Sequence, residues 1–292
     1  MGCGARAVVL GVFVAATSLV GAAATQQAAP AARTKPDVLA IGGSVTEIVY
    51  ALGEGDRLIA RDSTSTYPPE AAALPDVGYM RALSSEGVLS VGPELIISED
   101  GAGPPEVLDV LQAASVDWIT IPDDFTAEGI RKKISAVGAA LDVSEKADAL
   151  SAKVGGELAE VAERAAAHDG APRRVLFILS LQGGRILASG TNTAANGIIG
   201  LAGAVNAIDA FEGYKPLTDE AVNESAPDVI LMMDRGGDHG ASDDALFAMP
   251  ALVTTPAART RAVIRMDGLY LLGFGPRTAQ AAAELNRRLY GS

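Results

Sequence analysis

The chain has 292 residues, a formal net charge of −13, two histidines and one cysteine. So acidic a chain repels nucleic-acid phosphates and anionic lipid, which excludes nucleic acid as a partner. Two histidines are too few for a histidine-rich zinc or manganese pocket, and one cysteine forms no disulfide framework.

The N-terminal residues have the pattern of a secretory signal peptide. Residues 1–6 hold one basic residue and no acid, residues 7–20 are apolar, and residues 22–24 are small alanines suited to cleavage. The apolar run is shorter than the about 20 residues of a membrane span, although an uncleaved anchor is the alternative. The only cysteine, Cys3, precedes this run, whereas a lipoprotein cysteine would follow it. We therefore expect residues 1–24 to be a cleaved signal peptide that exports the protein to the periplasm.

A mobile leader, residues 25–35, is expected before the folded part, and residues 36–143 are predicted to form an α/β lobe. Predicted strands lie at 37–41, 58–60, 95–98 and 118–121, and predicted helices at 44–53, 105–114 and 126–141. Ser44 is expected to cap the first helix, with Glu47 completing a capping box. Strands and helices that alternate with short loops favour a parallel sheet covered on both faces.

A long helix is predicted within residues 144–170. This stretch is rich in alanine, glutamate, lysine and leucine, and its apolar residues recur at helical spacing after Ser144, a candidate cap. A helix in the middle of the chain would hold two lobes at a nearly fixed separation, unlike a flexible glycine linker.

Residues 171–292 are predicted to form a second α/β lobe on the same plan. Strands are expected at 174–179, 185–189, 228–233 and 262–266, with a glycine turn at 183–184, and helices at 196–201 and 276–290. The predicted fold class is therefore α/β, with two Rossmann-like lobes joined by one long rigid helix and a ligand cleft between the lobes.

A short motif, in which a glutamate lies seven residues before a proline and an apolar run, occurs twice in the chain. Leu-Ser-Ser-Glu ending at Glu86 is followed seven residues later by Pro93 and an apolar run, and Leu-Thr-Asp-Glu ending at Glu220 is followed in the same way by Pro227. The repeat indicates two similar lobes, each with an acidic residue just ahead of a strand. Paired carboxylates at matching positions suggest a partner that touches both lobes.

Several segments resemble the periplasmic binding proteins that serve iron-siderophore, cobalamin and haem ABC importers. GGSVTEIVYALG at 42–53 and TYPP at 66–69 look like that group, and LPDVGYMRAL at 74–83, MDGL at 266–269 and LGFGPR at 272–277 are similar to its haem-binding branch. The similarity runs from about residue 36 to residue 290, nearly the whole mature chain. It implies a non-enzymatic periplasmic carrier whose cargo is ferric haem b.

The resemblance implies that Tyr79 is the axial ligand of the haem iron, supported by Arg81. A loop tyrosine at the edge of a cleft can present its phenol to a ligand, and ferric haem accepts tyrosinate. Because a free phenol has a pKa of about 10, the iron and a nearby cation must favour its ionised form. The alternative is that Tyr79 is a half-buried packing residue.

Further haem contacts are expected from both lobes. Arg235 follows an apolar strand, where ligands of open α/β lobes meet the loops, and its guanidinium suits a propionate or the haem face. Tyr270, Phe274 and Tyr67 could wall the cleft, although core packing is the alternative for them, as an ordinary surface position is for Arg235. His239 is a minor alternative as a second axial ligand.

The number of haems expected is one per chain. Some haem-binding relatives use a histidine of the second lobe to hold a second haem, and the matching loop at 180–184 contains none.

The resemblance also gives Glu86 and Glu220 a role. In this group the matching glutamates meet arginines on the two permease subunits, and one carboxylate per lobe would orient docking on a positive surface. The alternative is that each is an early-helix acid favoured by the helix dipole. We expect a monomer that works with an ABC permease and with an outer-membrane haem receptor system.

Two other functions are open. A siderophore or cobalamin carrier would belong to the same binding class, although the pair Tyr79 and Arg81 fits haem better. An exported hydrolase is the other, but the sequence has no Gly-x-Ser-x-Gly elbow, no His-Glu-x-x-His helix and no plausible Ser-His-Asp set.

Overall fold

The structure is a computed structural model that describes residues 1–4, 35–182, 184–234 and 242–291. The expected signal peptide beyond residue 4 and the leader up to residue 34 therefore lie outside the described residues. Residues Lys35–Ser292 form one compact unit that contains two β-sheets.

The first sheet is four-stranded and parallel, as the sequence predicts. Its strand order is β2-β1-β3-β4, with β1 at Val38–Ile41, β2 at Leu58–Arg61, β3 at Leu95–Glu99 and β4 at Asp117–Ile121. The helices between these strands are α1 (Gly43–Ala51), α2 (Ser85–Ser90), α3 (Pro105–Ala113) and α4 (Ala127–Ala140), with short 3₁₀ turns at Gly55–Arg57 and Pro69–Ala73. All of β1 is buried, because alternate residues enter two different hydrophobic clusters on the two faces of the sheet.

The second sheet has six strands and is mixed. The order is β10-β9-β5-β6-β8, with β7 paired to β5; the bounds are β5 Arg174–Gln182, β6 Arg185–Ser189, β7 Val205–Asn206, β8 Tyr214–Leu217, β9 Val229–Asp234 and β10 Val263–Asp267. Strands β5, β9 and β10 are parallel, whereas β6 runs antiparallel to both β5 and β8. The expectation that this lobe repeats the plan of the first is therefore wrong for β6 and β8. A tight connection after β5 can return the chain only in the antiparallel direction.

The helices around the second sheet are mostly short. They are α6 (Ala194–Leu201), α7 (Asp219–Ser225), α8 (Asp243–Phe247), α9 (Pro256–Thr260), α10 (Gly268–Leu272) and α11 (Thr278–Tyr290). In the part of the chain that the structure describes, no helix is both long and apolar enough to cross a membrane.

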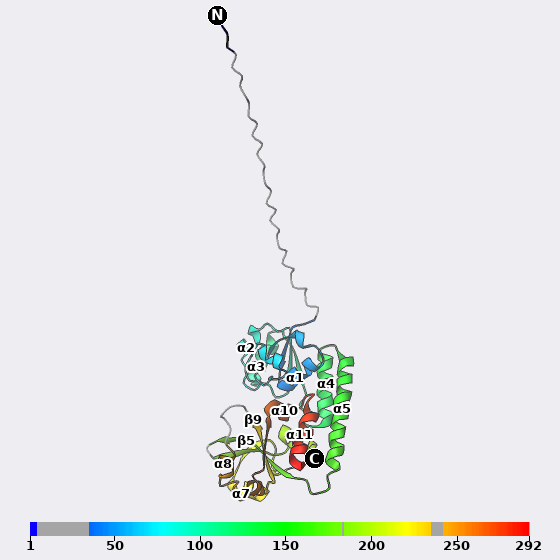
Figure 1. Ribbon diagram of the computed structural model, residues 1–292, viewed down its shortest axis with the longest axis vertical. Helices are drawn as coiled ribbons and strands as arrows, with labels where there is room; N and C mark the ends of the chain where they lie inside the picture. The colour runs from blue at the N-terminus through cyan, green and yellow to red at the C-terminus, as the bar shows by residue number, and fades with distance from the viewer. Residues whose placement is uncertain (5–34, 183, 235–241, 292) are drawn as a thin grey trace. The chain divides into compact units, whose positions relative to one another are not determined.

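The long central helix is confirmed as α5, Ser144–Ala166. Helix α5 packs on α4 and also contacts α11 and α6 (Figure 1). Its buried residues include Ala147, Val154, Leu158 and Val161. These residues belong to a hydrophobic cluster that includes strands of both sheets. A connector whose buried face packs against other helices in this way is stiffer than a fully exposed one.

Two predicted helix caps are wrong. Helix α1 has Gly42 at its N-cap, and Ser44 Oγ instead donates to Glu99 Oε1 at 2.5 Å. Helix α5 has Val143 at its N-cap, so Ser144 is its first residue rather than its cap. In α1, tertiary hydrogen bonds compete with the local ones, and the sequence pattern contains no information on such distant partners.

Candidate ligand-binding site

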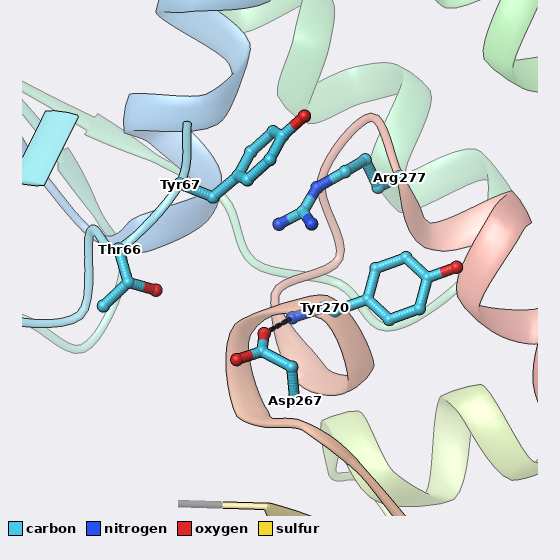
Figure 2. A pocket seen from close by; sticks show the side chains of 5 residues that line it. All are labelled: Thr66, Tyr67, Asp267, Tyr270 and Arg277. Carbon is cyan, nitrogen blue, oxygen red and sulfur yellow. Dashed lines mark hydrogen bonds between the residues drawn. The ribbon is translucent and has the colours of Figure 1, made fainter. Parts of the chain in front are cut away.

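A pocket of about 300 Å³ lies where the loop after β2 meets the chain after β10 (Figure 2). Thr66 and Tyr67 come from the loop after β2, Asp267 ends β10, Tyr270 lies in α10, and Arg277 precedes α11. Ligands of open α/β folds bind at the carboxyl ends of the strands, which is where this pocket lies.

Arg277 is the centre of this pocket. The carbon at the centre of its guanidinium lies 3.5 Å from the Tyr67 ring centroid and 5.3 Å from that of Tyr270. Nη2 donates to Glu47 Oε2 at 2.8 Å, and the backbone N–H donates to Oε1 at 3.1 Å. The side chain therefore joins α1, the loop after β2 and α10, and with the two rings it forms an aromatic and cationic surface.

Tyr270 is held by the start of its own helix. Asp267 Oδ1 accepts a hydrogen bond from the Tyr270 backbone N–H at 2.8 Å and so caps α10. Burial raises the pKa of the Tyr270 phenol, and the charge and hydrogen bond of Glu284 raise it further, against the opposing charge of Arg277. The phenol is therefore neutral at physiological pH.

Tyr79 is exposed and lies on a loop that is hydrogen-bonded to the loop after β2. Tyr79 is 47% exposed, so part of its surface is open to a ligand. The Ser63 backbone N–H donates to the Gly78 carbonyl at 2.9 Å, which joins the Tyr79 loop to the loop that carries Thr66 and Tyr67. Tyr79 is not among the residues that line the pocket.

Arg81 is exposed, and its charge acts on a tyrosine of the second sheet. Burial raises the pKa of Tyr214 in β8, while hydrogen bonds to Thr193 and Ala195 and the charge of Arg81 oppose the increase. Arg81 is thus close enough to the second lobe to interact with it electrostatically. The sequence analysis missed Tyr214, which lies in a short strand and in no recognisable motif.

The structure corrects one expectation and does not describe two others. Phe274 is only 1% exposed and packs edge-on against Phe125, with ring centroids 5.3 Å apart. Core packing, the alternative for this residue, is therefore what the structure supports. Arg235 and His239 lie outside the described residues.

The sequence analysis also missed Arg277, Asp267 and Thr66 as pocket residues. All three lie in segments quoted for the family resemblance: Thr66 precedes Tyr67, Asp267 follows a predicted strand, and Arg277 is three residues after Phe274. Only the fold brings them together, because they come from distant parts of the chain. Over the described ranges, no group of three or more histidine, cysteine, aspartate or glutamate residues could hold a metal ion.

Glu86 and Glu220 have matching local structures, which confirms the repeat at this level. Each lies exposed in the first turn of a short helix, α2 or α7. Ser84 caps α2 by accepting from the Gly87 N–H, and Thr218 caps α7 by accepting from the Ala221 N–H. Strands β3 and β9 follow these helices.

Residues 38–269 match the family model described as periplasmic binding protein. The chain belongs to this family. Its members are ligand carriers rather than enzymes, so this chain is a binding protein of the ABC-transporter type with a periplasmic or other extracytoplasmic location. The suspected family and the two-lobed α/β fold class are both confirmed.

Three similar proteins illustrate the range of ligands. The periplasmic heme-binding protein BhuT, solved in complex with two hemes, is 41% identical, with a TM-score of 0.83 over 87% of this chain and 97% of that one. An uncharacterized ABC transporter substrate-binding lipoprotein, YvrC of Bacillus subtilis, is 26% identical over 87% of this chain and 79% of its own length. The vitamin B12-binding protein of Pectobacterium atrosepticum is 26% identical over 86% of this chain and 88% of its own length.

Proposed function

We propose that this protein captures ferric haem b in the periplasm and delivers it to the permease of an ABC importer. The observation that carries the proposal is Tyr79, an exposed tyrosine on a loop hydrogen-bonded to the loop that carries two pocket residues, with Arg81 two residues later. A tyrosinate is an established ligand of haem iron, and a neighbouring cation favours the ionised phenol. The 41% identity to BhuT supports the same cargo.

The pocket at Arg277 supports a planar ligand with acidic groups. Its 300 Å³ is at the low end of the roughly 300–1,000 Å³ of ligand pockets, so it would hold only part of a haem. Tyr67 and Tyr270 would contact the macrocycle, and Arg277 lies where it could interact with a propionate or the ring face. Tyr79 would then ligate the iron, and Arg81 would be the cation that favours its ionised phenol.

In this proposal residues 1–24 direct export and are removed, and the mature protein is a monomer that binds one haem. Haem would reach it from an outer-membrane haem receptor system, and Glu86 and Glu220 would contact the permease.

Cobalamin is the second candidate cargo, because a vitamin B12-binding protein matches 86% of this chain. Haem is favoured because a phenol and a guanidinium two residues apart suit ferric iron better than a corrinoid cobalt with its own axial base.

The test is a visible absorption titration of the purified mature protein with ferric haemin, run in parallel with cyanocobalamin. We expect saturation by haemin at one per chain, with the charge-transfer band of a phenolate–iron bond. The Y79F variant, which removes only the hydroxyl group, should lose this band and bind about 100-fold more weakly, since even outer partners of metal ligands affect affinity by roughly 10–100-fold.

The matched control is Y50F, which removes a phenol hydroxyl from α1, away from the pocket residues. It should bind haemin as the wild type does. Saturable binding of cyanocobalamin without any response to haemin would replace haem by a corrinoid. Haemin binding with an unchanged spectrum in Y79F would remove Tyr79 from the iron.

A further inference from the structure

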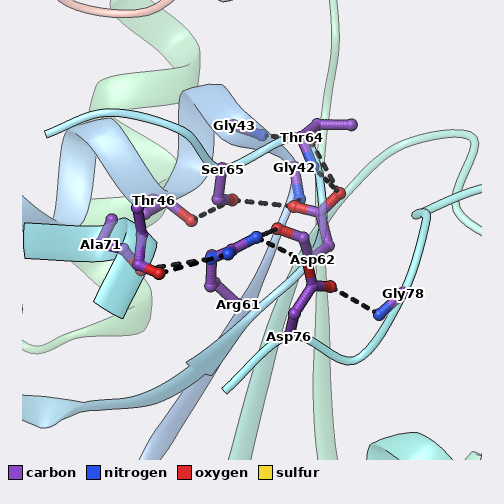
Figure 3. Close-up of polar contacts among 11 residues, drawn as sticks. Gly42, Gly43, Thr46, Arg61, Asp62, Thr64, Ser65, Ala71, Asp76 and Gly78 are labelled. Atoms are coloured by element: carbon purple, nitrogen blue, oxygen red, sulfur yellow. Dashed lines mark hydrogen bonds and ion pairs between the residues drawn. The ribbon is translucent and has the colours of Figure 1, made fainter. Parts of the chain in front are cut away.

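The segment that carries Tyr79 is tied to the end of β2 by an ion pair between Arg61 and Asp76 (Figure 3). We propose that these two residues position the Tyr79 phenol for its ligand without touching the ligand themselves. This inference rests on the proposed function, because it concerns how the haem ligand is held.

Arg61 connects three parts of the N-terminal lobe. Its Nη1 donates to Asp76 Oδ2 at 2.8 Å and to the Asp62 carbonyl at 3.0 Å, while Nε donates to the Ala71 carbonyl at 3.2 Å. Its backbone N–H donates to the Pro75 carbonyl at 2.9 Å, and its carbonyl accepts from the Val77 N–H at 3.0 Å. The chain at residues 75–77 is therefore fixed against β2 through both backbone and side chain.

Asp76 extends this connection to the residue just before Tyr79. Its second oxygen, Oδ1, accepts from the Gly78 N–H at 2.8 Å. Gly78 has a φ of +101°, a conformation that residues with a Cβ rarely adopt, although open space surrounds the position of that Cβ. Asp76 thus stabilises the turn that sets the direction in which Tyr79 leaves the backbone.

The other side of Gly78 is held by the loop after β2. The Gly78 carbonyl accepts from the Ser63 N–H at 2.9 Å. The neighbouring Asp62 is fully buried: its Oδ1 accepts from the Gly42 N–H at 3.0 Å, and its Oδ2 from the Thr64 N–H at 3.0 Å. Gly78, the residue before Tyr79, is therefore linked through its N–H to Asp76 and through its carbonyl to the loop that Asp62 joins to the start of α1.

These contacts affect ligand binding more than stability. The Tyr79 side chain is half exposed, so its direction depends mainly on its backbone. The Asp76 side chain is 40% exposed, and exposed ion pairs contribute little to folding. A loop that is ordered before binding does not lose conformational entropy when the ligand binds. The Arg61–Asp76 ion pair therefore contributes to ligand affinity by ordering the Tyr79 loop in advance.

The experiment measures haemin affinity and the phenolate–iron band in D76A and D76N. D76A removes the ion pair and the acceptor for the Gly78 N–H, and we expect about tenfold weaker binding with a weaker band. D76N keeps an acceptor oxygen without the charge, and we expect an intermediate loss of about threefold. The matched control is D244A, which breaks the exposed ion pair of Asp244 with Arg261 in the other lobe and should bind as the wild type does.

A double variant separates positioning from a general structural effect. If Asp76 acts through the phenol, D76A should cause no further loss of affinity in a Y79F background, whereas a general loosening would lower affinity there too. Circular dichroism and thermal unfolding establish whether each variant is folded. If D76A does not fold, the same comparison is made with D76N, alone and in the Y79F background.

The outcomes distinguish the two proposals. Wild-type protein that does not bind haemin overturns both. Wild-type binding that depends on Tyr79, together with D76A and D76N variants that match D244A in affinity and spectrum, overturns only the positioning role of Arg61 and Asp76. An equal loss on D76A with and without the Tyr79 hydroxyl also overturns it.

Discussion

Arg277 makes more of the contacts around the pocket than any residue selected from the sequence. It lies against Tyr67 and Tyr270 (Figure 2). It also pairs with Glu47, whose side chain is only 6% exposed. A carboxylate buried to this degree needs its cation, because an unpaired buried charge is costly. Arg277 therefore stabilises the junction of α1 with the chain before α11, whatever else it contributes to the ligand.

We expect R277A to lower the free energy of unfolding by roughly 2 kcal/mol, because it leaves Glu47 with a backbone donor but no cation. R277K keeps the charge but loses the planar contact with the rings and should fall between R277A and the wild type. The measurement is urea unfolding, with E47Q and the double variant E47Q/R277A completing a cycle. Strictly additive effects of the two substitutions would contradict a direct coupling between these residues.

At the residue scale, the sequence allowed candidate ligand-binding residues to be selected, but it did not predict the tertiary partners of polar side chains. Tyr79 and Arg81 could be selected from a short motif, and both are exposed in the structure. Ser44 and Glu47 also stood in a recognisable motif, yet each binds a partner more than fifty residues away. Spacing along the chain reveals local hydrogen bonds, whereas tertiary partners of buried polar groups depend on the fold.

At the scale of elements, apolar strands and the amphipathic helices were the predictable part. Strand β1 is a short continuous apolar run and helix α5 has a periodic pattern, and both were predicted within a few residues of their observed ends. Strands β7 and β8 were missed because the first has two residues and the second contains Pro216, which is unusual inside a sheet. The antiparallel direction of β6 likewise depends on the turn that precedes it.

Glu54 connects elements of the first lobe to α5. It lies in the turn after α1, and its carboxylate pairs with Lys146 of α5 at 2.8 Å and with Lys35 at 2.9 Å. Burial raises the pKa of Glu54, but the hydrogen bonds and charges of the two lysines outweigh burial and lower it from 4.5 to about 2. The ionised form is thus favoured in the folded protein.

This lowered pKa gives a pH dependence with a definite sign. The stabilisation is present above the unfolded pKa of about 4.5 and is lost as the pH falls through about 2. We expect E54Q to be less stable than the wild type near pH 6 and the difference to shrink steadily on acidification across this window. Urea unfolding at several pH values measures it, with E106Q, an exposed glutamate of α3, as the control. A difference that stays constant from pH 6 to pH 2 would contradict the role of the Glu54 charge.

For the whole molecule, the important feature is a core shared by both sheets. One hydrophobic cluster includes Val38 of β1, Val154 of α5 and Val175 of β5. Such packing opposes large changes in the separation of the two lobes, because close-packed interiors deform little. Two docking groups on different lobes would then be held at a fixed spacing. A fixed spacing would suit a permease in which each group meets a different subunit.

Glu86 and Glu220 are the proposed docking groups, and their effect should depend on acting together. We expect E86A/E220A to keep wild-type haemin affinity, since neither residue lines the pocket, but to stimulate the ATPase of the reconstituted permease less at a given concentration. Loss of two charges that steer association should lower the apparent affinity for the permease by about tenfold or more.

The matched control for this variant is E106A/E145A. It also removes two exposed glutamates from the first turns of helices, α3 and α5, and so changes net charge and helix-dipole interactions equally. If position matters, only E86A/E220A weakens stimulation, and each single variant has a smaller effect than the pair. Equal losses of stimulation in both double variants would mean that the permease responds to the net negative charge of the protein. Full stimulation by E86A/E220A would contradict the docking role and favour the alternative that each glutamate only stabilises the start of its helix.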